Sequence, residues 1–469
     1  MGPRRIAISL AVLAVVAAVL AALVNGGSFT AHRGSTDSAP AGGTSSIRPR
    51  PARPAPAAQP TQDVPEPVLT PVTSGPAPRP AKVRAALDAV DDSGVGLSGA
   101  VLDVATGARL YARRADSPVI PASTMKLLTS AAALQILGPE HTFTTRVVSA
   151  SASRIVLVGG GDPYLASRTR GGTYPRRSSV ADLAKETAAQ LRQSRRSTVS
   201  LGYDDSLFTG PDWNRTWPNA YRDQVTPLSA LWVEEGRVNG GSPGLRQSDP
   251  ANTAAQTFAK ALRAQGIKVT AVRKATAAKS DRTIAAVSSM PLERIVEQLL
   301  LVSDNDAAEV LFRQAAIGAG RSGSFAEGRA VVERTLRTLG VWHAATSIHD
   351  GSGLSRSTRV HADTLVKVLR LAAGPKRPQL RPVVTGLPVA GVEGSLRTRF
   401  HDSASAAGIG VLHAKTGTLT GVHSLAGVVR ARDGSLMVFA FLINDAANGY
   451  AAILLLDRLG GALSSCGCR

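Results

Sequence analysis

Hydrophobic and polar positions follow regular periods over most of the chain beyond residue 82. Apolar and polar residues alternate on both sides of the turn Ala105-Thr-Gly107, which predicts an antiparallel hairpin of strands 96–103 and 108–113. Apolar residues then recur at helical spacing from Ser123 to Leu137, before Gly138-Pro139. The same criteria predict further elements: strands at 143–150 and 154–158, helices at 180–194 and 250–265, two helices that meet at Ser303, a hairpin of strands 419–430 and 435–442, and a closing helix at 446–459.

The first 82 residues follow neither period. Two arginines precede Ile6–Val24, an almost wholly apolar run without a charge, which predicts that residues 1–25 are a signal peptide or an N-terminal membrane anchor. No small-x-small cleavage site follows in Asn25-Gly-Gly27, which favours the anchor. Residues 26–82 are rich in Pro, Ala and Arg and predict a disordered linker. In both cases we expect an extracytoplasmic protein of the cell envelope, membrane-anchored or secreted.

The folded part of the chain is long enough for more than one domain. Mixed short strands and helices occupy residues from about 143 to 282. This block separates Ser123 from Ser303 by 180 residues, which is more chain than a single helical lobe needs. We therefore expect a main domain in two pieces, an insertion between them and a short tail, with the boundaries 83–142, 143–282, 283–463 and 464–469. The two cysteines, Cys466 and Cys468, could form a small disulfide, pair between chains or lie in a frayed end, and we favour the frayed end.

Composition and charge narrow the classes of function. The net charge of +20 comes mostly from Arg, which outnumbers Lys 44 to 10, and it fits an anionic neighbourhood such as a wall polymer or a lipid surface. The chain has no helix-turn-helix, Cys/His finger or aromatic-basic motif, so we expect no nucleic-acid partner. A solvated Arg-rich surface is the simplest explanation of the charge. The eight histidines show no metal-ligand spacing, and we expect neither a metal nor a cofactor.

Ser123 and Lys126 carry the first candidate chemistry. Residues three positions apart lie on one face of a helix, so the hydroxyl and the amine would face the same cavity. A serine hydroxyl becomes a good nucleophile when a base takes its proton, and a lysine can do so if burial or a second cation keeps it partly neutral. Free N–H groups at the helix start would stabilise an oxyanion. We predict a nucleophile and its base.

Two more motifs follow in the chain. They are Ser303-Asp-Asn305, between two helical patterns, and Lys415-Thr-Gly417, before strand 419–430. By chance, a chain of this composition would hold about one Ser-x-x-Lys, about 0.7 Ser-x-Asn and well under 0.1 Lys-Thr-Gly. The ordered set has a chance of roughly one in a hundred or less. Order and context, rather than any single motif, therefore carry the prediction.

The ordered set resembles the D-alanyl-D-alanine carboxypeptidase/endopeptidase family of low-molecular-mass class C penicillin-binding proteins. The resemblance covers residues 84 to 460 and extends to further segments: Gly160-Gly-Asp-Pro163, Asp205-Ser-Leu-Phe208, Ser303-Asp-Asn-Asp-Ala-Ala-Glu309, Asp350-Gly-Ser-Gly-Leu-Ser355 and Leu387-Pro-Val-Ala-Gly391. It implies an α/β (α+β) fold of the penicillin-binding-protein and β-lactamase type, in which helices flank an antiparallel sheet and a smaller domain is inserted. It also implies a serine-type carboxypeptidase or endopeptidase that acts on peptidoglycan stem peptides and is inhibited covalently by β-lactam antibiotics.

The resemblance implies a role for each motif residue. Ser123 would attack the carbonyl between two terminal D-alanines and form an acyl-enzyme, with Lys126 as general base. Ser303 would relay a proton to the leaving amine, and Asn305 would bind the substrate amide. Lys415 would lower the pKa of Lys126.

The third motif would also bind the substrate. Lys415 would attract the terminal carboxylate, and Thr416, Gly417 and Thr418 would line the substrate site, the two threonines donating hydrogen bonds. The backbone N–H groups of Ser123 and Thr418 would form the oxyanion hole. We expect Asp350 to stabilise a turn rather than to act as a catalytic acid.

Two departures from the family pattern concern the insertion. It is shorter than in the longest members, so we expect a reduced or missing subdomain. Members that bind the free amine of diaminopimelate place an acid shortly after a Trp, whereas Trp217-Pro-Asn219 offers a neutral residue here. The stem-peptide preference stays open, as does the balance between carboxypeptidase and endopeptidase activity.

Two other functions remain as alternatives. A serine β-lactamase of class A needs a Glu with an Asn four residues later between the second and third motifs, and no Asn lies between Asn305 and Asn444. A catalytically silent wall-binding protein would retain the cleft without turnover. The intact set of catalytic residue types disfavours that second alternative.

Overall fold

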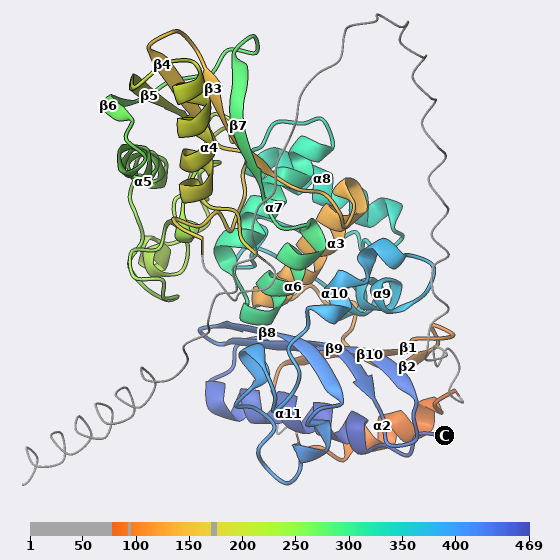
Figure 1. Ribbon diagram of the computed structural model, residues 1–469. Helices are drawn as coiled ribbons and strands as arrows, with labels where there is room; N and C mark the ends of the chain where they lie inside the picture. The colour runs from red at the N-terminus through yellow and green to blue at the C-terminus, as the bar shows by residue number, and fades with distance from the viewer. Residues whose placement is uncertain (1–76, 92–94, 170–175) are drawn as a thin grey trace, which may run out of the picture. The chain divides into compact units, whose positions relative to one another are not determined.

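The structure, a computed structural model, describes residues 77–91, 95–169 and 176–469, all within the compact unit Thr70–Arg469. The first of its two sheets has five antiparallel strands in the order β2-β1-β10-β9-β8 (Figure 1). These strands are β1 (Leu97–Asp103), β2 (Arg109–Arg113), β8 (Leu412–Leu419), β9 (Val422–Arg430) and β10 (Leu436–Ile443). Strands from both ends of the folded chain therefore share one sheet.

This first sheet is buried on both faces because its central strands are apolar at nearly every position. Along β10, Phe439 and Phe441 pack on one face, whereas Val438 and Ala440 pack on the other. Helices α2 (Pro80–Asp88) and α11 (Gly449–Ser465) lie on the first face, and α9 (Ala362–Ala373) lies on the second (Figure 1). A continuous apolar run is what a strand between two helical layers requires.

The helical layer beyond α9 is organised around one central helix. Its other members are α3 (Met125–Leu137), α6 (Leu292–Val302), α7 (Asn305–Gly318), α8 (Phe325–Thr338) and α10 (Pro382–Thr385). Every residue of α3 from Met125 to Leu134 is buried, and the helix contacts α6, α7, α8 and α9. A helix that is apolar all round is held by packing on every side.

The second sheet is mixed and lies within the inserted part of the chain. Its order is β6-β5-β4-β3-β7, with parallel pairing of β4 with β5 and of β5 with β6. The strands and their two covering helices are β3 (Thr144–Ser149), β4 (Arg154–Val158), β5 (Thr198–Asp204), β6 (Lys268–Lys274), β7 (Arg282–Ser288), α4 (Val180–Gln193) and α5 (Pro250–Ala264). Both helices bury apolar faces against the sheet, which gives this region a core of its own.

The structure confirms most of the predicted elements and moves some boundaries. The pattern predicts a single strand over 419–430, but a turn at Gly421, with φ of 72°, separates the edge strand β8 from β9. The Lys415 motif therefore lies inside a strand rather than ahead of one. The second sheet continues to Ser288, beyond the expected end of the insertion at 282, because β7 pairs with β3. Helix α2 begins at Pro80, inside the expected linker.

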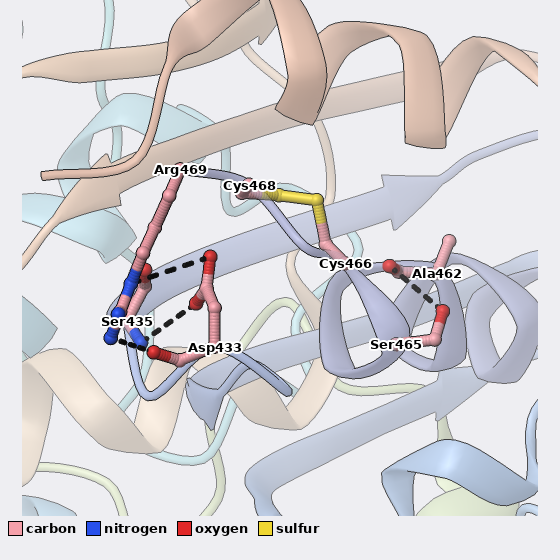
Figure 2. Close-up of a disulfide and its surroundings, with 7 residues drawn as sticks. All are labelled: Asp433, Ser435, Ala462, Ser465, Cys466, Cys468 and Arg469. Carbon is pink, nitrogen blue, oxygen red and sulfur yellow. Dashed lines mark hydrogen bonds and ion pairs between the residues drawn. A yellow bond between two sulfur atoms is a disulfide. The ribbon is translucent and has the colours of Figure 1, made fainter. Parts of the chain in front are cut away.

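The C-terminal tail is ordered, in contrast to the frayed end favoured from the sequence. Cys466 and Cys468 form a disulfide (Figure 2), and both are buried in the core cluster beside α2 and α11. The Cys468 carbonyl accepts a hydrogen bond from the Arg79 amide at 2.6 Å, and Arg469 donates to the Asp433 carbonyl. The sulfur atoms extend the apolar core, which explains why so short a segment is held.

Within the described residues, no helix is both long enough and apolar enough to cross a membrane. The predicted signal peptide or anchor at 1–25 lies outside the described residues, as does most of the predicted linker.

Candidate active site

Ser123 lies in a single 3-10 turn, Ala122–Thr124, which leads directly into α3. The carbonyl of Pro121 fixes this turn: it accepts hydrogen bonds from Thr124 Oγ1 at 2.7 Å and from Ser424 Oγ on β9 at 2.8 Å. The predicted nucleophile is therefore held between the central helix and the first sheet, at the beginning of the helix rather than within it.

The amine of Lys126 lies one turn beyond Ser123 and is completely buried. Its Nζ atom is 2.9 Å from Ser123 Oγ, 2.7 Å from Asn305 Oδ1 and 2.9 Å from the Ser352 carbonyl oxygen. Burial lowers the pKa of Lys126 to about 8, although Glu309 and other nearby carboxylates oppose this shift. An amine with this pKa is partly neutral near neutral pH and can accept the hydroxyl proton.

Lys415 is the second buried amine, and it lies on β8. Its Nζ donates to the Thr416 carbonyl at 2.8 Å. Burial, followed by repulsion from Lys126, holds the pKa of Lys415 well below its ordinary value. The resemblance implies that Lys415 lowers the pKa of Lys126. In the structure burial is the largest cause of the lowered pKa of both amines, and the repulsion between them acts in the same direction.

Glycine at position 417 lets β8 run beside the nucleophile. A Cβ atom there would lie 3.0 Å from the Ser123 nitrogen and 2.9 Å from the Pro121 oxygen. The contact with the Pro121 oxygen is shorter than real Cβ atoms show and the contact with the Ser123 nitrogen is at that limit, so a side chain at Gly417 would force the backbone to shift. Thr416 and Thr418, on either side, both border the cavity.

The Ser303-Asp-Asn305 motif forms the junction between α6 and α7. Ser303 ends α6 with φ of 59°, and Asp304 caps α7 by accepting the Ala307 amide at 3.0 Å. The side chain of Asn305 is fixed at both ends, because Oδ1 accepts from Lys126 and Nδ2 donates to the Gln224 carbonyl at 3.0 Å. This tight junction places Ser303 at the cavity and Asn305 against the base.

A buried ion-pair network holds this junction to the inserted part of the chain. The guanidinium of Arg237 lies 2.8 Å from Asp304, 3.2 Å from Asp306 and 3.3 Å from Glu235. Burial raises the pKa of Asp306 to about 6 and that of Glu235 well above its ordinary value, and Asp304 adds repulsion. Arg237 therefore neutralises a cluster of acids that would otherwise repel one another.

An open cavity of about 650 Å³ contains these groups. Ser123, Ser303, Asn305, Thr416 and Thr418 contribute from the motifs. The inserted part of the chain contributes the opposite side, formed by Ala220, Tyr221, Asp223, Gln224, Arg237, Ser242 and Pro243. The cavity joins the two parts of the chain and is large enough for a short peptide end.

The structure brings together the residues that the motifs predict. Lys126 contacts Ser123 and Asn305 directly, and Lys415 is buried beside Thr416 on the adjoining strand. The prediction for Asp350 is confirmed, because it accepts the amides of Gly353 and Ser355 at 3.1 and 2.6 Å within a turn.

Other residues of the site were not predicted as such. Tyr221, Asp223 and Arg237 belong to no motif, and only the fold brings them to the cavity. Trp217 lies away from the cavity: its indole N–H donates to Asp350 at 2.8 Å. Glu309 ends a segment that carries the family resemblance, a signal that could have identified it.

An antiparallel sheet flanked by helices, with a buried Ser-x-x-Lys pair facing Ser-x-Asn and Lys-Thr-Gly motifs, defines the class of active-site serine enzymes that includes penicillin-binding proteins and serine β-lactamases. Within this class, the sequence pattern of the D-Ala-D-Ala carboxypeptidase 3 (S13) family matches residues 82–242 and 239–459. The chain belongs to that family, as the resemblance implied.

The matches to known relatives cover most of this chain and most of each relative. Carboxypeptidase Rv3627c of Mycobacterium tuberculosis is 38% identical over 403 residues, covering 83% of this chain and 85% of the relative. Carboxypeptidase DacB of Mycolicibacterium smegmatis is 36% identical over 380 residues, covering 79% and 81%. The structure of penicillin binding protein 4 from Haemophilus influenzae has a TM-score of 0.66 at 21% identity, covering 80% of this chain and 97% of that one. This likeness confirms the predicted fold.

Proposed function

We propose that the protein is a serine-type D-Ala-D-Ala carboxypeptidase that hydrolyses peptidoglycan stem peptides through an acyl-enzyme. The observation that carries this proposal is the 2.9 Å contact between Lys126 Nζ and Ser123 Oγ at the cavity, with the pKa of Lys126 lowered to about 8. Membership of the S13 family and relatives named as carboxypeptidases support the same reaction.

Each motif residue has a role in the proposed reaction. Ser123 Oγ attacks the carbonyl carbon between the two D-alanines while Lys126 takes the hydroxyl proton. The C–N bond then breaks, and the terminal D-alanine leaves with a proton delivered through Ser303. Water hydrolyses the remaining ester and regenerates Ser123. Asn305 binds the substrate amide close to the bond that breaks.

The edge strand β8 binds the peptide end. Lys415, with Thr416 and Thr418, attracts and hydrogen-bonds the terminal carboxylate. The N–H groups of Ser123 and Thr418 stabilise the oxyanion, and Gly417 allows the close approach on which this depends.

β-Lactam antibiotics acylate Ser123 in the same way. Because opening the lactam ring leaves the departing amine attached, the adduct persists longer than the natural ester. Cleavage of crosslinked peptides, a D,D-endopeptidase activity, is chemically equivalent, since it breaks a similar D-Ala amide with a larger leaving group. The open cavity supports this second activity.

The place of action follows from the substrate. Peptidoglycan lies outside the cytoplasm, and the apolar residues 6–24 with their basic flank support export. We place the enzyme in the cell envelope, tethered to the membrane by the N-terminal segment or released from it.

The test is release of D-alanine from a synthetic stem pentapeptide that ends in D-Ala-D-Ala. We expect equimolar D-alanine and tetrapeptide from the wild-type protein and neither from Ser123→Ala. A crosslinked dimer of stem peptides, assayed in parallel, measures the endopeptidase activity. If the wild type released no D-alanine but rapidly hydrolysed a β-lactam, the β-lactamase alternative would replace the proposal.

A further inference from the structure

The direction of the lone pair on Lys126 depends on a carbonyl outside the three motifs. A neutral amine has two N–H groups and one lone pair. Asn305 Oδ1, at 2.7 Å, and the Ser352 carbonyl oxygen, at 2.9 Å, can only accept hydrogen bonds. When they take the two N–H groups, the lone pair faces the third partner, Ser123 Oγ. The Ser352 carbonyl is therefore one of the two groups that aim the base.

Asp350 fixes the peptide unit to which this carbonyl belongs. Its Oδ1 accepts a hydrogen bond at 3.1 Å from the amide of Gly353, which shares a peptide plane with the Ser352 carbonyl. Its Oδ2 is anchored by the Ser355 amide at 2.6 Å and by the Trp217 indole at 2.8 Å. Because the plane is rigid, the contact at Gly353 orients the carbonyl towards Lys126.

Glu309 holds the preceding peptide units from the other side. Its carboxylate accepts the Gly351 amide at 3.0 Å and the Ser352 amide at 2.7 Å. Thr129, on α3, donates to the Gly351 carbonyl at 2.7 Å, so the turn is tied to the helix of the base as well. Glu309 lies one turn after Asn305 on α7, so one helix positions both acceptors of Lys126.

Both carboxyl groups are completely buried, and such burial is costly for an acid. Burial raises the pKa of Glu309 and of Asp350, whereas the hydrogen bonds that their oxygens accept act in the opposite direction and favour the ionised form. Both oxygens of each carboxyl group accept hydrogen bonds from N–H groups. An ionised carboxylate accepts such bonds better than a protonated carboxyl group does. The acids therefore serve as fixed acceptors for a turn that contacts the base.

We propose that Glu309 and Asp350 are positioning residues: they hold the Ser352 carbonyl against Lys126 and so direct the lone pair of the base at Ser123. This inference rests on the proposed role of Lys126 as the base of an acyl-enzyme reaction. Neither acid is among the residues that line the cavity.

The first test uses the full chain with Glu309→Gln, and Glu333→Gln as a matched control on the surface of α8. For a chromogenic β-lactam, the acylation rate constant at saturation and the dissociation constant of the initial complex are measured separately. In Glu309→Gln the amide NH₂ opposes a backbone N–H, so we expect the rate constant to fall at least about tenfold while the dissociation constant and Tm stay close to wild type. Glu333→Gln should behave as wild type. An unchanged rate constant in folded Glu309→Gln would overturn the proposal.

Thr129→Val is a milder variant if Glu309→Gln does not fold. It removes the hydroxyl that ties Gly351 to α3 and keeps the shape of the side chain. We expect a smaller fall in the same rate constant, in the order wild type, Thr129→Val, Glu309→Gln or Asp350→Asn. Equal rate constants for wild type and Thr129→Val, combined with a fully folded variant, would contradict the proposal.

A second readout does not need the reaction. With lysine labelled by ¹³C at Cε, the titration of Lys126 is followed by NMR, and Lys126→Arg assigns its signal. Five titratable groups face this amine: Lys415 from β8, Asp304 and Asp306 at the start of α7, Glu309 on α7 and Asp350 in the turn. Loss of a carboxylate and a loosened Ser352 contact both disfavour the ammonium form, so we expect a lower midpoint in Glu309→Gln. An unchanged midpoint would overturn the proposal, whereas failure of wild-type acylation would overturn only the proposed function.

Discussion

The two sides of the cavity are built differently. On the side formed by α3 and β8, Lys126 and Lys415 are completely buried and hydrogen-bonded to fixed partners. On the side formed by the insertion, Asp223, at the end of the 3-10 helix Asn219–Asp223, and the loop residues Ser242 and Pro243 are exposed. Catalytic groups need fixed geometry and a shielded amine, whereas recognition can rest on exposed loops. From this comparison we infer that the first side carries out the chemistry and binds the terminal carboxylate, whereas the second side selects among stem peptides.

Replacing Lys126 should separate the two sides most strongly. In Lys126→Met the base is lost while the cavity keeps its shape, so we expect the rate constant for acylation by benzylpenicillin to fall by about 10²–10⁴. The dissociation constant of the initial complex should change little. Stopped-flow competition against a fluorescent penicillin measures both quantities, with Lys260→Met on the surface of α5 as control. A loss below tenfold would remove Lys126 from the role of base.

The pH dependence of acylation should follow the protonation of Lys126, on the buried side of the cavity. Lys126 can accept a proton only when it is neutral, and its pKa is lowered to about 8. Below pH 8 the ammonium form dominates, so the rate should rise with pH by roughly tenfold per unit and become constant above pH 8 to 9. Rate constants from pH 5.5 to 10 would show this. A profile that is flat from pH 6 to 9 would contradict the lowered pKa.

Arg237 connects the two sides, and its loss should affect stability first. In Arg237→Gln, the buried Asp304 loses its cation and Asp306 keeps only Arg246, at 3.5 Å, which costs about 3 kcal/mol of the free energy of unfolding. Denaturant unfolding measures this cost, with the exposed Arg222→Gln as control. A change within 0.5 kcal/mol, on the order of ordinary surface substitutions, would show that the network does not join the insertion to α7.

The smallest effect is expected on the exposed side. Asp223 faces the cavity in contact with solvent, so its charge is screened. In Asp223→Asn we expect KM for a stem peptide to change by a few-fold, while acylation by benzylpenicillin is unchanged. Ser242→Ala should keep the KM and the acylation rate of the wild type, which would support this division. A large fall in acylation would show that the exposed side takes part in the chemistry.

The sequence predicts the buried side better than the exposed one, for physical reasons. Ser123, Asn305 and Lys415 stand in short motifs because the chemistry restricts both residue type and spacing. Asp223 and Arg237 reach the cavity through loops whose path depends on the second sheet, and no local pattern encodes it. The tail shows the same limit: the docking of Cys468 depends on its contact with Arg79, far away in the chain.

Two details, the division of one expected strand and the effect of Glu309, could not be predicted from a local pattern for a further reason. The division of β8 from β9 depends on one backbone conformation at Gly421, inside a run that otherwise reads as strand. The effect of Glu309 depends on hydrogen bonds to backbone amides of a distant turn, which have no side-chain signature.

The most direct test of the central claim is intact-mass analysis of the protein after incubation with benzylpenicillin, alongside Ser123→Ala. We predict that the wild type gains the mass of one penicillin per chain, that the adduct persists for minutes or longer, and that peptide mapping places it on Ser123. The variant should show no gain. A wild-type protein that neither forms an adduct nor consumes the drug would contradict the claim that Ser123 and Lys126 form an acyl-enzyme site.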